Sequence, residues 1–195
     1  MLNWFEKKLS FFFPVLCLWQ DSRPLWLIGG FFALGLEIFS YLYFQSHLDL
    51  WPCAYCVRIR FMMVVIFVSA LWAALAPQRL FFKIPGYLLS FAAILEGLRL
   101  SWLLEEINVK SLYLLDLNEG CKALVASFPF GLPLARWLPA HFRPIGVCGV
   151  DSIWFFLGLS MTQWLIIVYL ILLIGLSLML ASFLWQRFSF AAKDG

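Results

Sequence analysis

Four stretches of the chain are apolar over nearly their whole length and are separated by more polar segments. A helix needs about 20 mostly apolar residues to cross the hydrocarbon core of a bilayer. Each of the four stretches is long enough, and the last one carries no charged side chain. The pattern therefore predicts four transmembrane helices, at about 25–44, 57–76, 80–104 and 163–185.

The composition excludes an ordinary soluble domain. Of the 195 residues, 64% are hydrophobic and 13% are charged, whereas soluble domains have about 45–50% apolar and about 25% charged residues. A disordered chain would need low hydrophobicity and high charge. The net charge of +3 is too small, and the basic residues are too scattered, to indicate binding of nucleic acid. We therefore expect an all-α membrane protein that forms a single integral membrane domain over residues 1–195.

The distribution of lysine and arginine predicts the orientation. Basic residues concentrate in short cytoplasmic loops. Here the segment before the first stretch, the link between the second and third, and the tail after the fourth are basic, whereas the short loop at 45–52 carries no lysine or arginine. The long loop carries four such residues, offset by five acidic residues, and long loops count less in this rule. We therefore expect both termini in the cytoplasm, with a lead-in at 1–24 and a tail at 186–195. Two loops then face outward, a short one at about 45–56 and a long one at about 105–162.

The long outer loop contains a short apolar segment at 134–139, which includes Arg136 and Trp137. Such a segment is suited to the membrane surface, because an apolar body and a polar tip can face different media. A segment that folds back onto the bundle is compatible with the same pattern. The expected architecture is a four-transmembrane-helix bundle with two outer loops, the second long and containing a short interfacial helix.

The expected topology sorts the five cysteines. Cys53 and Cys56 lie at the outer end of the second predicted helix, Cys121 and Cys148 lie in the long outer loop, and Cys17 is alone on the cytoplasmic side. An even number of outward cysteines suits an oxidising compartment. We interpret Cys17 as a small buried apolar residue.

The C-x-x-C spacing of Cys53 and Cys56 closes a small disulfide ring, and its position favours a reactive one. Cys56 precedes the first turn of a helix, where exposed N–H groups and the helix dipole stabilise a thiolate. Arg60 follows four residues later on the same helical face. A thiolate beside a fixed cation is an activated nucleophile and a good leaving group. A metal site is disfavoured, because neither His47 nor His141 has the spacing of a metal finger.

Cys121 and Cys148 form a second outer pair. Two pairs allow three connectivities, and thiolate attack permits exchange between them. One interpretation is two static bridges, and the other is a relay that carries electrons from the loop to the membrane. A relay needs a terminal oxidant, but the chain has no glycine-rich dinucleotide motif and no haem-attachment motif. The acceptor that we expect is a lipid-soluble quinone beside Cys56, where Arg60 stabilises the developing negative charge on oxygen.

Glu37 lies inside the first predicted helix, where a carboxylate is costly and often functional. We expect it to pair with another residue of the bundle. Glu96 and Arg99 are three residues apart in the third predicted helix, which favours an ion pair on one helical face.

The sequence resembles the DsbB family of bacterial inner-membrane thiol oxidases. The resemblance covers most of the chain. Its motifs, in order, are Leu36-Glu37, Phe44-Gln45, Pro52-Cys53-Ala54-Tyr55-Cys56 followed by Arg60, Leu132-Pro133-Leu134-Ala135-Arg136-Trp137-Leu138-Pro139 followed by Cys148, and the segment 154–165. This ordered set is far more specific than a single C-x-x-C.

The resemblance implies a quinone-dependent protein-disulfide oxidoreductase in the bacterial inner membrane, with both loops in the periplasm. It implies that the partner is a periplasmic DsbA-like protein of thioredoxin fold, and that the acceptor is ubiquinone, or menaquinone when oxygen is absent. By motif match, Cys121 would form the mixed disulfide with the partner, Cys148 would exchange with Cys53, Cys56 would face the quinone, and Arg60 would contact it.

Two departures from the family pattern bear on the quinone site. The pair Arg58-Ile59 is not the commonest one in the family, and Leu104 stands where some members have histidine. Together with a long lead-in, they suggest a DsbI-type paralogue that serves one dedicated DsbA-like partner. Two other hypotheses stay open: a non-enzymatic membrane carrier or assembly subunit with structural loop disulfides, and an enzyme similar to vitamin K epoxide reductase. The order of the cysteines favours DsbB over the second.

Overall fold

The computed structural model describes residues 21–114, 128–146, 148–149 and 154–191. Its four long helical segments are α2 (Arg23–Phe39) with its continuation η1 (Ser40–His47), α3 (Ala54–Leu75), α4 (Leu80–Leu114) and α7 (Met161–Ala191). Each is long and apolar enough to cross a membrane, which confirms the predicted four-helix bundle. The lead-in at 1–20, with Cys17, and the loop segment 115–127, with Cys121, lie outside the described residues.

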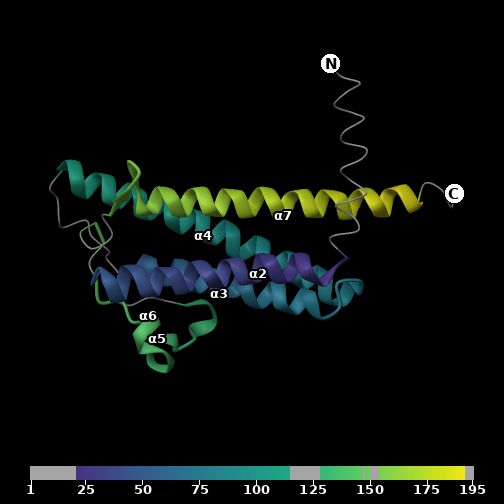
Figure 1. Ribbon diagram of the computed structural model, residues 1–195, viewed down its shortest axis with the longest axis horizontal. Coiled ribbons are helices and arrows are strands. Elements are labelled where there is room, and N and C mark those ends of the chain that lie inside the picture. Colours follow the sequence, from purple (N-terminus) through teal and green to yellow (C-terminus); the bar gives the residue numbers. More distant parts are fainter. Residues whose placement is uncertain (1–20, 115–127, 147, 150–153, 192–195) are drawn as a thin grey trace, which may run out of the picture.

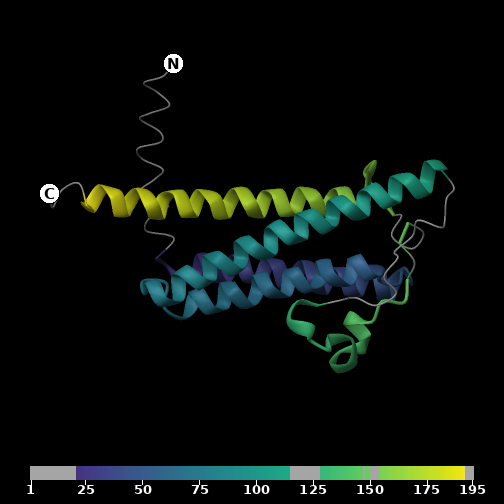
Figure 2. The same ribbon diagram turned by 180° about the vertical axis from the view of Figure 1, so that it is seen from behind.

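The helices run along one common direction (Figure 1). Figure 2 shows α4 crossing the bundle obliquely, from the side of α3 at one end to the side of α7 at the other. The end of η1, the start of α3, the end of α4 and the start of α7 lie at the same end of the bundle (Figure 1). The start of α2, the link between α3 and α4, and the end of α7 lie at the opposite end.

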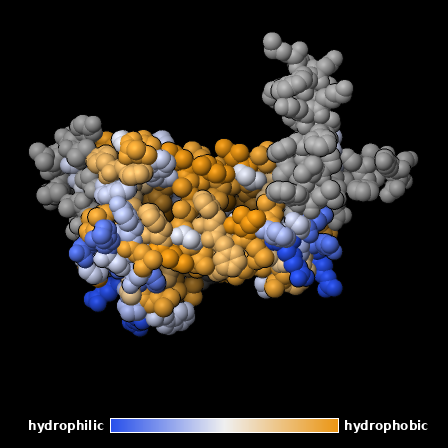
Figure 3. Space-filling view, in the orientation of Figure 1, coloured by the Kyte–Doolittle hydropathy of each residue, from blue (hydrophilic) through white to orange (hydrophobic). Residues whose placement is uncertain are grey.

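The surface of the bundle is apolar along its middle and polar toward its ends. Figure 3 shows a broad hydrophobic band over the helices, with hydrophilic residues gathered near both ends of this face. Phe31, Trp72, Leu88 and Ile171 are between 41% and 65% exposed. A soluble protein rarely exposes so much contiguous apolar surface, whereas the hydrocarbon core of a membrane is a good solvent for it.

The first two helical segments exceed their predicted bounds by two or three residues at one or both ends, and α4 and α7 run further still at their C-terminal ends. The helix α4 continues past residue 104 to Leu114, and Asn108 keeps a buried side chain within this extension. The long outer loop is therefore shorter than the 105–162 that we expected. The helix α7 extends through 186–191, which the sequence pattern assigns to the tail.

The long outer loop contains two short helices where the sequence predicts one at 134–139. These helices are α5 (Leu134–Trp137) and α6 (Pro139–Phe142), and the 3-10 turn η3 (Pro129–Gly131) precedes them. Proline lacks the N–H that a continuing helix needs, but it is well suited to the first position of a new helix. Pro139 therefore ends α5 and begins α6.

A two-stranded hairpin leads into α7 and was not predicted from the sequence. Strand β1 (Phe155–Phe156) pairs antiparallel with β2 (Leu159–Ser160). Leu157 and Gly158 form the turn with φ angles of 52° and 79°, and a two-residue hairpin turn of this kind needs positive φ at both positions. Only Gly158 adopts this conformation without a steric cost, so the sequence signal for the turn is weak.

Tyr169 of α7 joins three helices in the interior of the bundle. Its side chain is fully buried, and its hydroxyl donates a hydrogen bond to the carbonyl oxygen of Ile59 in α3 at 3.1 Å. Gly97 of α4 makes room for the ring, because a Cβ atom there would lie 2.2 Å from a ring carbon. The close approach of α4 and α7 therefore depends on the missing side chain at position 97.

Candidate active site

The motif Cys53–Cys56 forms the start of α3. Cys53 is the N-cap residue, with an extended backbone, and its sulfur accepts a hydrogen bond from the N–H of Cys56 at 3.2 Å. In a helix cap, the side chain of the N-cap residue reaches the N–H two or three residues further on. The cysteine spacing therefore sets the start of the helix and the position of both sulfur atoms.

The two sulfur atoms lie 2.6 Å apart, and both residues are buried free thiols. A disulfide bond is about 2.05 Å long, so a small movement closes the ring. The hydrogen bond between the two sulfurs, together with burial, holds the pKa of the Cys53 thiol well above its usual value. When the reduced pair loses a proton, the position of Cys56 at the positive end of α3 favours negative charge on Cys56 over Cys53.

Arg60 lies one turn further along α3 and is 6% exposed. Residues of α2 and η1 hold its guanidinium group: Nη1 donates to Gln45 Oε1 at 3.0 Å, Nη2 donates to Ser40 Oγ at 3.3 Å, and Nε lies 3.9 Å from Glu37 Oε1. Glu37 is thus paired with another residue of the bundle, as we expected. The pair balances two charges that would each be costly alone at this depth.

The segment η1 is a π-helix, which was not predicted from the sequence. Ser40 and Gln45 are five residues apart, and an α-helix would turn them about 140° away from each other. The wider π turn, which bonds residues five apart, brings both side chains toward Arg60. Such turns are frequent at functional sites, but no residue type in 40–47 marks the change of pitch in advance.

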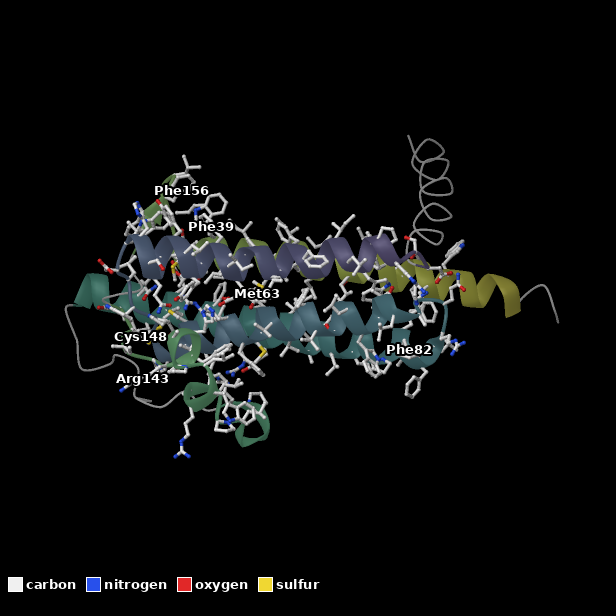
Figure 4. The ribbon with its side chains drawn as sticks, turned by 60° about the horizontal axis from the view of Figure 1, so that its bottom comes forward. Phe39, Met63, Phe82, Arg143, Cys148 and Phe156 are labelled. Atoms are coloured by element: carbon white, nitrogen blue, oxygen red, sulfur yellow. The ribbon has the colours of Figure 1, made fainter. Side chains whose placement is uncertain are left out.

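A cavity of about 510 Å³ lies beside Cys56 and Arg60. Its walls come from α2, η1, α3, α7 and the hairpin, and they include Phe39, Met63 and Phe156. Figure 4 shows Phe39 and Phe156 close together at one end of the bundle, with Met63 further along the helices. The walls are mostly apolar and aromatic, which is typical of sites for small ligands of this size.

The residues of the cavity fit a quinone headgroup, which is a flat apolar ring with two carbonyl oxygens. Arg60 supplies N–H donors for an oxygen that gains negative charge. Cys56 supplies a sulfur in the same wall. The sequence-predicted pair of Cys56 and Arg60 is therefore brought together.

Cys148 lies at the same end of the bundle as Phe39 and Phe156 (Figure 4). It is 2% exposed, takes part in a disulfide, and belongs to the same buried cluster as Cys53 and Cys56. Three of the four predicted redox cysteines are thus gathered together. The fourth, Cys121, lies outside the described residues.

Two backbone hydrogen bonds position the chain that leads to Cys148. The N–H groups of Ile145 and Gly146 donate to the carbonyl oxygen of Pro52 at 3.1 Å and 3.2 Å. Pro52 directly precedes Cys53. These bonds therefore hold the segment that precedes Cys148 against the residue that precedes Cys53.

Arg58 is not among the residues that line the cavity. Its Nη2 lies 3.1 Å from Glu96 Oε1, and Arg99 Nη2 lies 2.7 Å from the same oxygen. The expected pair of Glu96 and Arg99 is present, but Arg58 shares its carboxylate. This cluster ties α3 to α4 and leaves Arg60 as the arginine of the cavity.

Glu105 gathers the polar side chains at the start of α7. Ser160 Oγ donates to it at 2.9 Å, Gln163 Nε2 donates to it at 2.8 Å, and Thr162 Oγ1 also donates to it. The preceding residue, Leu104, is fully buried in the core and does not line the cavity. The polar residues of the motif at 154–165 thus join the start of α7 to α4.

Comparisons with known proteins identify similar proteins. The family model described as "Disulfide bond formation protein DsbB" matches residues 22–179. Relatives named "Protein-disulfide oxidoreductase DsbI" come from Lelliottia amnigena (38% identical over 139 residues, covering 69% of this chain and 62% of the relative), Escherichia coli O1:K1 / APEC (35% over 139 residues, 69% and 61%) and Salmonella typhimurium strain LT2 (34% over 139 residues, 69% and 61%). The chain thus matches about three fifths of the length of these relatives.

Glu37→Gln is expected to lower the free energy of unfolding by ~3 kcal/mol, because it leaves the buried Arg60 without the carboxylate that faces it. Glu96→Gln is the matched control. Its partners Arg58 and Arg99 are 26% and 56% exposed in their side chains, so the loss should stay within ~1 kcal/mol. Unfolding in detergent, followed by circular dichroism, measures both. Equal losses would show that Arg60 does not depend on Glu37.

Proposed function

The chain belongs to the DsbB family of disulfide bond formation proteins, and from this membership we propose that it is an enzyme that passes electrons from a protein dithiol to a membrane quinone. With four helices able to span a bilayer, it is a multi-pass inner membrane protein. The observation that carries the proposal is that Cys56 and Arg60 share the wall of one apolar cavity. Disulfides that only brace loops would not need a buried arginine beside a free thiol.

The proposed electron donor is a periplasmic DsbA-like protein of thioredoxin fold. Both termini would lie in the cytoplasm and both redox loops in the periplasm. The distribution of lysine and arginine supports this orientation, and so does the position of both loops at one end of the bundle (Figure 1). The chain is similar to proteins named "Protein-disulfide oxidoreductase DsbI", and we propose, as the resemblance to the DsbI type implies, that it serves a single dedicated partner.

In the proposed relay, a thiolate of the partner attacks Cys121 of a Cys121–Cys148 disulfide, and Cys148 leaves as a thiolate. Cys148 then attacks Cys53 of a Cys53–Cys56 disulfide, and Cys56 leaves as a thiolate. The second thiol of the partner releases it as a disulfide and leaves Cys121 reduced. Cys121 then attacks Cys148, which restores their disulfide and leaves Cys53 as a thiol. Two electrons and two protons have now passed from the partner to the pair of Cys53 and Cys56.

The free thiols of Cys53 and Cys56 and the disulfide of Cys148 are consistent with this last state. A bound quinone, which we propose to be ubiquinone or, without oxygen, menaquinone, supplies an acceptor for two electrons and two protons and leaves as the quinol. Arg60 donates N–H groups to the oxygen that gains charge, and its fixed position avoids reorganisation. Cys53 closes the disulfide on Cys56, and the apolar walls keep water from the sulfurs.

Cys56→Ser is expected to lower the rate of quinone reduction by at least about 100-fold, because a serine side chain cannot form the disulfide or leave as a stable anion. Cys17→Ser is the control and should retain the rate. The assay mixes purified protein with a reduced DsbA-like protein and a short-chain ubiquinone, and follows the quinone absorbance. A wild-type protein that reduces no quinone here would contradict the proposed function.

Cys148→Ser, mixed with the partner in its oxidised form, is expected to accumulate a mixed disulfide: the Cys121 thiolate attacks the disulfide of the partner, one partner sulfur leaves as a thiolate, and Cys148 is no longer present to displace the partner from Cys121. Non-reducing electrophoresis with mass spectrometry of the linked peptides identifies the bond. Cys121→Ser serves as the comparison and should trap no partner. If Cys121→Ser traps it equally well, the proposed order of exchange is wrong.

A further inference from the structure

Both polar atoms of the Gln45 side-chain amide make hydrogen bonds. Its Oε1 accepts a hydrogen bond from Arg60 Nη1 at 3.0 Å, and its Nε2 donates to the carbonyl oxygen of Ala140 in α6 at 2.9 Å. A guanidinium group only donates and a carbonyl oxygen only accepts. Only one orientation of the amide satisfies both neighbours, so Gln45 joins the arginine of the cavity to the long outer loop.

The helix α6 packs against both η1 and α3. The ring of His141 lies against Tyr41 of η1, with centroids 4.2 Å apart. Phe142 is 5% exposed and packs near Phe61 of α3, with centroids 6.5 Å apart. Burial and the charge of Arg60 lower the pKa of His141, so this contact adds no second cation beside Arg60 near pH 7. The docked position of α6 is thus compatible with the charged arginine.

The chain that leaves α6 runs directly to Cys148. Its residues at 145–146 bind the carbonyl oxygen of Pro52, next to Cys53. The segment 140–146 is therefore attached at two places: its backbone binds Pro52, next to the C-x-x-C motif, and Ala140 is linked to Arg60 through Gln45. A movement of Cys148 during disulfide exchange acts on both attachments.

We propose that Gln45 is a positioning residue that couples docking of α6 to the placement of Arg60, so that the docked loop and a bound quinone favour each other. This inference rests on the proposed quinone site. Coupling between two sites is reciprocal. If docking of α6 raises the affinity for quinone by some factor, bound quinone raises the docking equilibrium of α6 by the same factor. A thiol partner that draws the loop away loosens Arg60, and the guanidinium group regains its docked position only when the loop has returned.

Three substitutions separate the two ends of the amide. Gln45→Glu keeps an acceptor for Arg60, but a carboxylate cannot donate to the carbonyl oxygen of Ala140. Gln45→Lys keeps a donor for Ala140 but repels Arg60. Gln45→Leu removes both bonds. Ser46→Ala, at the exposed neighbouring position, is the matched control.

Arg136 is an exposed residue of α5. The rate at which trypsin cleaves after it reports docking of α5 and α6, and the measurement does not require the enzyme to reduce quinone. The full-length protein in detergent is digested with and without a ubiquinone that carries one isoprene unit, and mass spectrometry follows the fragment that begins at Trp137. One neutral hydrogen bond corresponds to about a fivefold change in a docking equilibrium. We therefore expect cleavage about fivefold faster in Gln45→Glu and Gln45→Leu than in Ser46→Ala and Gln45→Lys.

The quinone distinguishes coupling from docking alone. It should slow the cleavage in Ser46→Ala but have no effect in Gln45→Glu, Gln45→Lys or Gln45→Leu. The proposal is overturned if Gln45→Glu is cleaved at the control rate, if quinone protection persists in Gln45→Glu and Gln45→Lys, or if it is absent from a control that reduces quinone. A control that shows protection but reduces no quinone would refute the proposed function and leave the coupling standing.

Discussion

Arg60 carries a permanent positive charge on a membrane-spanning helix, where an isolated charge is strongly disfavoured. Its partners Glu37, Ser40 and Gln45 all come from one continuous helical segment. The π turn in that segment is what allows a hydroxyl and an amide, five residues apart, to reach the same guanidinium group. The need to neutralise and bond this arginine therefore sets the position of α2 and η1 against α3.

The same arrangement leaves one side of Arg60 facing the cavity. The helix α7 forms the far wall, and it is held by the hydrogen bond from Tyr169 and by the polar cluster around Glu105. Cys56 faces the cavity because Cys53 caps α3. One short segment at the start of α3 thus supplies the helix cap, the pair of redox cysteines and the arginine of the cavity. The outer loop supports this segment through Pro52 and Gln45.

The sequence predicted the features that depend on local pattern. Four apolar stretches correspond to four helices, because a bilayer requires long apolar segments. The C-x-x-C motif lies at the start of α3, as predicted, but Cys53 and not Cys56 is the residue that precedes the first turn. Features that depend on contacts between distant segments were not predicted. Glu37 pairs with Arg60 of another helix, and Arg58 of α3 pairs with Glu96 of α4. The π turn accompanies the bonds from η1 to Arg60, which also join distant segments. The predicted fourth span ends where the membrane-spanning part of α7 ends, at Trp185, but α4 runs on past residue 104, where the buried Asn108 packs beyond the apolar stretch.

The central claim is that the reduced pair of Cys53 and Cys56 gives its two electrons directly to a quinone in the cavity beside Arg60. A single turnover without any protein partner tests this most directly. Fully reduced protein is mixed anaerobically with a short-chain ubiquinone, and quinol is measured together with the disulfides formed. The account predicts one quinol for each Cys53–Cys56 disulfide. Quinol formed without that disulfide, or the disulfide formed without quinol, would contradict it.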